Sequence, residues 1–159
     1  FGILPMLHGG DQERGARSST ENVHSILGME KALSIAMTNL DKDVNYIECL
    51  KIYFISALKD ISEDIEFNGH SLNLYKSSYT ILNVRFPIQN DLFIFSLDLA
   101  GISVSGGSAC QSGSSKGSHV LAEILKDDEL DKTSVRFSFS KFTTKEELDI
   151  TLQKIKELL

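Results

Sequence analysis

Cys110 is the residue of this sequence best placed to do chemistry, because it lies in a segment made largely of glycine and serine. Between residues 103 and 118, 11 of the 16 residues are Gly or Ser. A segment of this composition cannot pack a hydrophobic core, so its thiol stays reachable and mobile. We therefore interpret Cys110 as a candidate nucleophile that attacks a substrate in one place and delivers its cargo in another. The residues alone also fit a flexible surface connection that carries an inert thiol.

Other chemistries of cysteine and histidine fit the sequence less well. A phosphatase-type or rhodanese-type loop needs an arginine six residues after the cysteine, but Lys116 stands at that position. A zinc site needs paired Cys or His residues at short spacing, and neither cysteine has such a partner. The candidate bases for a thiol protease are His8, His24, His70 and His119. That alternative stays open, whereas Cys49 lies inside a helical pattern and is expected to be half-buried and unreactive.

The elements that must position Cys110 follow from the hydrophobic periodicity. Apolar spacing predicts an amphipathic helix over 21–39 with Thr20 as its N-cap, and a second helix, or the same helix after a bend, to about residue 60. A capping box, Thr144 with Glu147, opens the last predicted helix. The predicted strands cover 65–67, 81–86 and 134–139, and the remaining helices cover 91–100, 119–126 and 144–159. This order predicts an α+β (α/β) fold with a three- or four-stranded sheet covered by helices.

Composition limits the partners that the chain is expected to have. Its 159 residues are 42% hydrophobic and 24% charged, with a net charge of -6 and no long basic run. We expect no direct contact with nucleic acid or anionic lipid, and no apolar run approaches the roughly 18 residues of a membrane span. Two cysteines suit a reducing, cytoplasmic compartment, and no metal site is expected in the domain itself. We interpret the start at Phe1, directly before a motif-rich segment, as the mark of a partial chain.

Several separate blocks of the sequence together carry a resemblance. The first is His-Gly-Gly-Asp-Gln-Glu-Arg-Gly-Ala-Arg-Ser-Ser-Thr at 8–20. The later blocks are Asn-Val-Arg-Phe at 83–86, Ser-Gly-Gly-Ser-Ala-Cys at 105–110, Val-Leu at 120–121, Val-Arg-Phe-Ser-Phe at 135–139 and Phe-Thr-Thr at 142–144. In order and spacing they resemble the NifS/IscS-type cysteine desulfurases of the class V aminotransferase family. The long loop around Cys110 resembles the IscS-like branch rather than the SufS-like branch.

The resemblance implies a role for individual residues. Family members use pyridoxal 5'-phosphate to release sulfur from L-cysteine, leaving L-alanine and a persulfide on the enzyme's own cysteine. By position Cys110 matches that nucleophile, and it could also serve as a transient iron–sulfur ligand. Arg136 matches the arginine that binds the substrate carboxylate. If 134–139 is a strand, its side chain lies opposite Val135 and Phe137. Thr20 matches the threonine that reaches the cofactor phosphate of the partner subunit, which implies a homodimer.

The resemblance also implies what this chain lacks. The family's Schiff-base lysine, the aspartate at the pyridine nitrogen and the histidine over the ring all lie upstream of Phe1, so this chain alone is expected to be inactive. In a fold-type I enzyme, residues 1–20 would belong to the active-site loop of the large cofactor domain and 21–61 to connecting helices. Residues 62–159 would form the small C-terminal domain, with the catalytic Cys loop at 103–118.

The implied acceptor of the sulfur is an iron–sulfur scaffold or another protein, for cluster assembly or tRNA thiolation. Two other functions stay open. The whole protein could be a selenocysteine lyase or another class V enzyme, or the chain could be a non-catalytic module that docks a sulfur acceptor.

Overall fold

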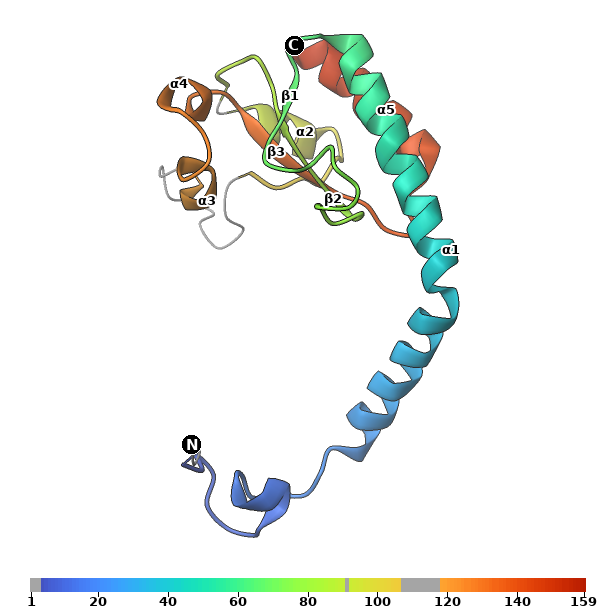
Figure 1. Ribbon diagram of the computed structural model, residues 1–159, viewed down its shortest axis with the longest axis vertical. Coiled ribbons are helices and arrows are strands. Elements are labelled where there is room, and N and C mark those ends of the chain that lie inside the picture. Colours follow the sequence, from blue (N-terminus) through green and yellow to red (C-terminus); the bar gives the residue numbers. More distant parts are fainter. Residues whose placement is uncertain (1–3, 91, 107–117) are drawn as a thin grey trace. The chain divides into compact units, whose positions relative to one another are not determined.

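A computed structural model describes residues 4–90, 92–106 and 118–159 of the chain. The chain divides into two compact units, Phe1–Leu40 and Asp41–Leu159. The elements in order, labelled where space allows in Figure 1, are η1(Gln12–Gly15), α1(Val23–Ile61), β1(Glu66–Phe67), β2(Ile81–Arg85), α2(Phe93–Leu99), α3(His119–Ala122), α4(Asp127–Leu130), β3(Ser134–Ser138) and α5(Lys145–Leu158). Among the described residues, no helix combines the length and the hydropathy that a membrane span needs.

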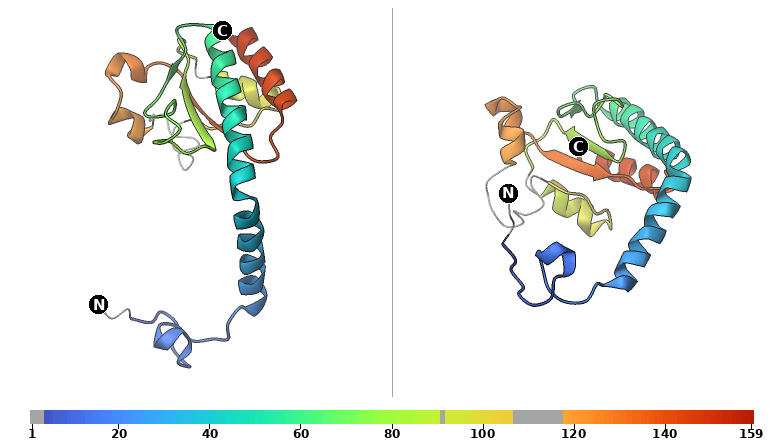
Figure 2. Two further views of the ribbon diagram at one scale, coloured as in Figure 1. Left: turned by 45° about the vertical axis from the view of Figure 1, so that its right-hand side comes forward. Right: turned by 60° about the horizontal axis from the view of Figure 1, so that its bottom comes forward.

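The first unit contains η1 and the start of α1. The prediction that Thr20 caps this helix is wrong, because α1 begins at Val23. Asn22 takes the capping role: its side-chain oxygen accepts a hydrogen bond from Ser25 N at 3.2 Å. The two predicted helical stretches form one continuous helix to Ile61, visible in the left view of Figure 2.

The second unit is built on a three-stranded antiparallel sheet in the order β1-β2-β3. Leu82 pairs with Phe137 and Val84 with Val135, so these buried side chains lie on one face, which we call the apolar face. The residues between them in β2 and β3 point to the opposite face, which we call the polar face. The expectation of a small sheet of three or four strands is confirmed.

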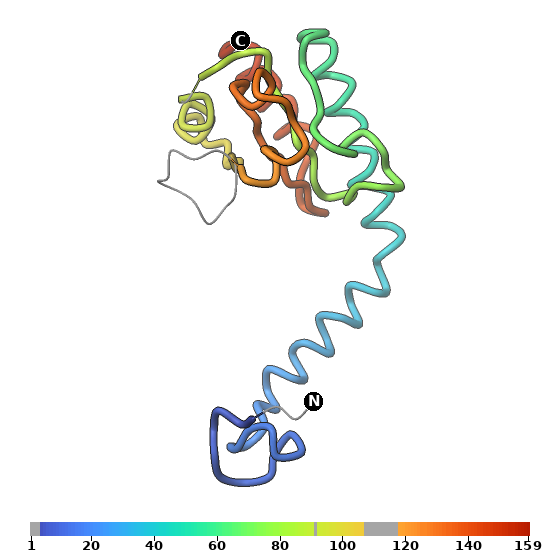
Figure 3. Tube along the Cα trace, turned by 60° about the vertical axis from the view of Figure 1, so that its left-hand side comes forward, coloured from blue at the N-terminus to red at the C-terminus, as the bar shows by residue number. Residues whose placement is uncertain are grey.

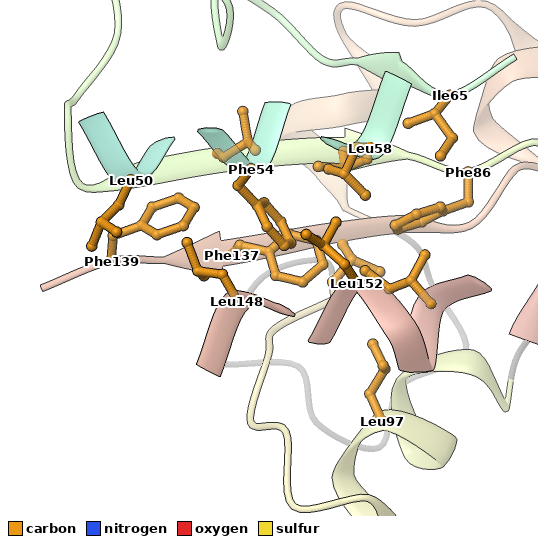
Figure 4. Packing of buried hydrophobic residues seen from close by; sticks show 14 of the residues in the cluster. Leu50, Phe54, Leu58, Ile65, Phe86, Leu97, Phe137, Phe139, Leu148 and Leu152 are labelled. Carbon is orange, nitrogen blue, oxygen red and sulfur yellow. The ribbon is translucent and has the colours of Figure 1, made fainter. Parts of the chain in front are cut away.

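The apolar face is covered by α5 and the C-terminal half of α1, as Figure 4 shows. Phe54 of α1 is fully buried, and its ring packs edge-to-face with the rings of Phe137 and Phe139 at centroid distances of 5.1 and 5.8 Å. From α5, Leu148 and Leu152 reach into the same cluster. The core of the second unit therefore lies between this sheet face and these helices, and α2 completes it with the fully buried Phe93 and Leu97.

The predicted capping box at the start of α5 is present. Thr144 Oγ1 accepts a hydrogen bond from Glu147 N at 3.2 Å, and the Glu147 carboxylate accepts one from Thr144 N at 2.8 Å. These two bonds satisfy backbone donors that the first turn leaves without helical partners.

The irregular connection from β1 to β2 is held by a buried lysine. Lys51 of α1 is fully buried, and its Nζ donates hydrogen bonds to Ser77 Oγ and Ser78 O, both at 2.9 Å. Burial lowers the pKa of Lys51 from its usual range. The connection can be followed in green along the Cα trace of Figure 3.

The predicted helix over 119–126 is shortened to four residues, and a second four-residue helix follows it after a turn. These are α3, whose N-cap Ser118 accepts a hydrogen bond from Leu121 N at 3.3 Å, and α4. Neither helix contains a buried residue. A second correction concerns Cys49, which is exposed on α1 and not half-buried as expected.

Candidate active site

Arg136 projects from the middle of β3 onto the polar face, opposite the buried Val135 and Phe137, as the strand alternation predicts. Its side chain is half-buried, and Nη2 donates a hydrogen bond to Ser105 Oγ at 3.4 Å. Arg136 Nε is buried and has no hydrogen-bond partner among the residues that the structure describes. A buried donor in this state favours a ligand that accepts hydrogen bonds, and a carboxylate matches the planar fork of a guanidinium.

The backbone of Arg136 also holds the start of the cysteine segment, the name we use for residues 103–118. Ser105 N donates to Arg136 O at 3.2 Å, and Arg136 N donates to Ser105 O at 2.7 Å. This antiparallel bridge fixes a point of the segment only five residues before Cys110 in the sequence. The candidate anion-binding side chain and the attachment of the segment that carries the candidate nucleophile therefore share one residue.

Cys110 and Lys116 lie outside the described residues, so the role assigned to Cys110 stays a prediction. At the far end the description resumes at Ser118, the N-cap of α3. The cysteine segment is thus held between a bridge on β3 and the start of a short helix.

The polar face carries a second arginine whose importance the sequence analysis missed. Arg85 of β2 is only 6% exposed, and its guanidinium contacts Glu66 of β1, Asn68 and Glu129 of α4. The hydrogen bond from Arg85, more than any other influence, holds the pKa of the Glu66 carboxyl below its ordinary value. The alternation of Val84, Arg85 and Phe86 would have placed Arg85 on the polar face, but its partners are distant in the sequence and no local pattern identifies them.

Asn68 joins the two arginine-bearing strands. Its side-chain nitrogen donates to Asn83 Oδ1 at 2.8 Å and to Ser134 Oγ at 3.0 Å, and its oxygen accepts from Arg85 Nη1 at 2.9 Å. Asn68 is almost fully buried, so these bonds satisfy its polar atoms inside the protein.

Thr20 lies in the first unit and its side chain is exposed. The turn before it is organised by Arg17, whose guanidinium donates to Ser19 O at 2.6 Å and contacts the Glu21 carboxylate. Thr20 is followed closely by the N-terminus of α1, where backbone amides favour an anion. An exposed hydroxyl at such a place suits one contact to a phosphate, although the cap itself comes from Asn22.

The sequence from residue 8 to residue 151 matches the family model described as aminotransferase class-V. The chain belongs to this family. The matched residues include Thr20, the cysteine segment and Arg136, so all three predicted site positions fall inside the class-V region.

Two relatives of this class-V chain are both described as the cysteine desulfurase IscS. It is 37% identical over 158 residues to the cysteine desulfurase IscS of Dictyoglomus turgidum, covering 99% of this chain and 39% of that protein. It is 41% identical over 154 residues to the cysteine desulfurase IscS of Buchnera aphidicola, covering 96% of this chain and 37% of that protein.

Solved structures agree with the sequence relatives. A NifS-like protein superposes with a TM-score of 0.76 at 32% identity, covering 97% of this chain and 38% of that one. The NifS-like protein of Rickettsia africae gives the same TM-score at 26% identity, covering 99% and 40%. The resemblance and the fold class are confirmed, and the class-V chain spans about two fifths of the length of these relatives.

Proposed function

We propose that this class-V chain is the C-terminal part of a pyridoxal-phosphate-dependent cysteine desulfurase that transfers sulfur from L-cysteine to Cys110. The observation that carries the proposal is Arg136. It combines a buried guanidinium donor without a partner among the described residues with a backbone bridge to Ser105, the described start of the segment that bears Cys110. The cysteine desulfurase relatives, matched over nearly the whole chain, supply the reaction class.

In the proposed reaction Arg136 binds the α-carboxylate of L-cysteine through charge-assisted hydrogen bonds. Pyridoxal phosphate, with its phosphate contacted by Thr20, would supply the electron sink for Cα of the substrate. The Cys110 thiolate attacks the substrate sulfur, so an S–S bond forms while the Cβ–S bond breaks. The electron pair of the broken bond stays with carbon, which takes up a proton, and the products are alanine and a Cys110 persulfide. Atoms and electrons balance without an external oxidant or reductant.

Among this chain's residues, Thr20 is the proposed contact to the cofactor phosphate, because its exposed hydroxyl lies just before the N-terminus of the long helix α1. We propose that it serves the partner subunit of a homodimer. The lysine that holds the cofactor would belong to the part of the whole protein that the longer relatives have and this chain does not.

The domain organisation is part of the same proposal. Residues 1–20 would complete the active-site loop of the cofactor domain, 21–61 would connect the domains, and 62–159 would form the small domain. The persulfide would pass to an iron–sulfur scaffold or another acceptor protein. A cytoplasmic location suits this chemistry, because a reducing compartment keeps Cys110 a thiol before each turnover.

The experiment replaces Cys110 by Ser in the whole protein with cofactor bound. Persulfide labelling from L-cysteine is expected to disappear while the cofactor absorbance is kept, because the cofactor would be held by other residues. Cys49→Ser is the matched control, since Cys49 is an exposed thiol on α1 and should change nothing. Sulfur transfer retained by Cys110→Ser would refute the proposal, and release of selenium from selenocysteine by that variant would favour a selenocysteine lyase.

The second part of the experiment tests Arg136. Arg136→Lys keeps the positive charge but loses the bidentate fork, which is worth about 1.5–3 kcal/mol for hydrogen bonds to charged groups. We expect kcat/KM for L-cysteine to fall by about 10- to 150-fold, mainly through KM. An unchanged KM would show that Arg136 does not bind the substrate carboxylate.

A further inference from the structure

The cysteine segment has two attachments, and the sequence patterns explain only the first. Its start is fixed by the bridge between Ser105 and Arg136. Its end is Ser118, from which the chain continues through α3 and α4. We propose that Arg85 is a positioning residue that fixes Ser118 by holding Glu129 of α4, and that it thereby sets where Cys110 can reach. This inference rests on the proposed function, because it concerns the delivery of the Cys110 thiol.

The helices α3 and α4, which follow the cysteine segment, are too short to be stable without contacts to the rest of the unit. Each is four residues long, far shorter than the roughly 12–15 residues that an isolated helix needs to be even marginally stable. Neither contains a buried residue, so hydrophobic packing attaches them weakly. Leu121 and Leu125 are only half-buried. The position of Ser118 must therefore depend strongly on polar contacts to the sheet.

Arg85 supplies such a contact. Its Nη2 donates to Glu129 Oε1 at 2.6 Å, and the same nitrogen donates to Glu66 Oε2 at 2.8 Å. The Arg85 side chain is 6% exposed and Glu129 is 27% exposed. Water screens this ion pair less than an exposed one, and Asn68 fixes the other side of the guanidinium. The pair therefore holds α4 in one place against β2.

Hydrogen bonds continue from Glu129 to Ser118. The second oxygen of Glu129 accepts from Lys126 N at 2.9 Å, which fixes the start of α4. The preceding turn is joined by the bond from Leu125 N to Leu121 O at 2.9 Å, and Leu121 N donates to Ser118 Oγ. Both oxygens of Glu129 are thus used, one by Arg85 of the sheet and one by the backbone at the start of α4.

The test measures single-turnover formation of the Cys110 persulfide per bound cofactor in the whole protein. Arg85→Met removes the charge while keeping an unbranched chain of similar length. We expect the rate constant to fall by about 10- to 100-fold, the effect of a misplaced reacting group, with KM for L-cysteine unchanged because Arg136 is intact. Glu129→Ala should give the same loss, and the double variant no more than either single one, because both act along one path.

Glu66→Gln is the matched control. It alters the Arg85 cluster from β1 but leaves the bond to Glu129, so it should leave the rate per bound cofactor within about twofold of wild type. A merely structural role for Arg85 would lower the yield of folded protein and leave that rate unchanged, which would overturn the inference. Equal losses from Glu66→Gln, or additive losses in the double variant, would also overturn it.

Two further outcomes are decisive. If Arg85→Met does not fold, Glu129→Ala alone carries the test, and a wild-type rate in that variant overturns the inference. If the wild-type protein forms no persulfide, the proposed function fails and this inference fails with it. A wild-type persulfide together with an unaffected Arg85→Met rate rejects only the role of Arg85.

Discussion

The two faces of the small sheet use opposite means to hold what lies on them. On the apolar face, α5 and the C-terminal half of α1 bury a continuous cluster that includes Phe54, Val84 and Phe137. On the polar face, α3 and α4 bury no residue of their own, and a buried arginine, a buried amide and carboxylates make the contacts. Apolar burial grows with area and has no preferred direction, whereas hydrogen bonds depend on direction and distance.

Each kind of contact suits what its face of the sheet has to do. The apolar face must keep the unit folded, for which non-directional burial suffices. The polar face must keep Arg136, Ser105 and Ser118 in defined places, because the candidate chemistry depends on them. Substitutions on the apolar face should therefore change the stability of the chain, and substitutions on the polar face should mainly change the proposed activity.

Phe54→Ala should have the largest effect on stability. Phe54 is fully buried and its ring contacts two other aromatic rings, so the loss includes both burial and a cavity. We expect the free energy of unfolding to fall by about 3–5 kcal/mol, measured by urea denaturation. Phe142→Ala is the control, because Phe142 is 79% exposed and its loss should cost little. An equal loss in the free energy of unfolding for the two variants would mean that the apolar face is not the main source of stability.

Part of this arrangement is visible in the sequence because it depends on local patterns. The alternation around Arg136 predicts both β3 and the face on which Arg136 lies, and the spacing of Thr144 and Glu147 predicts the cap of α5. The predicted cap of α1 at Thr20 is wrong because Asn22, a better capping residue than threonine, directly precedes the helix.

The missed features depend on contacts between distant parts of the chain. Residues 119–126 have a helical pattern, yet the helix ends at Ala122. The separate helix α4 follows, and its Glu129 contacts Arg85, 44 positions away in the sequence. Likewise, Arg85 stands out only once Glu66 and Asn68 are seen beside it. Such pairings are set by tertiary structure, which overrides local propensity in short elements.

Removing the N-caps of α5 and α3 tests the same contrast between the two faces, with a smaller expected loss of stability. Thr144→Ala removes the cap of α5, which packs on the apolar face, and we expect it to lower the free energy of unfolding by about 1 kcal/mol. Ser118→Ala removes the cap of α3, which buries nothing, so its cost in global unfolding should be below about 0.5 kcal/mol. Urea denaturation measures both costs. A cost for Ser118→Ala as large as that for Thr144→Ala would contradict the view that α3 is only weakly coupled to the core.

Lowering the pH should reveal the smallest effect, which is the contribution of Glu66 on the polar face to the free energy of unfolding. Its pKa is lowered from 4.5, chiefly by the hydrogen bond from Arg85 and further by Lys132. A carboxylate with a lowered pKa stabilises the folded state above the unfolded value, and that contribution is lost as the pH falls through the folded value. Glu66 is 47% exposed, so solvent screening limits the contribution to below about 1 kcal/mol.

The measurement compares wild type with Glu66→Gln by urea denaturation at about pH 7 and about pH 3. The stability advantage of the wild type should be present at the higher pH and shrink at the lower one. Asp149 and Glu157 also have lowered pKa values, but both variants retain them and their contributions cancel in the difference. Added salt should shrink the same advantage at the higher pH. If the difference in the free energy of unfolding between wild type and Glu66→Gln stayed constant across this pH range, the bond from Arg85 to Glu66 would not depend on the charge of Glu66. The polar face would then differ from the apolar face only in its geometry.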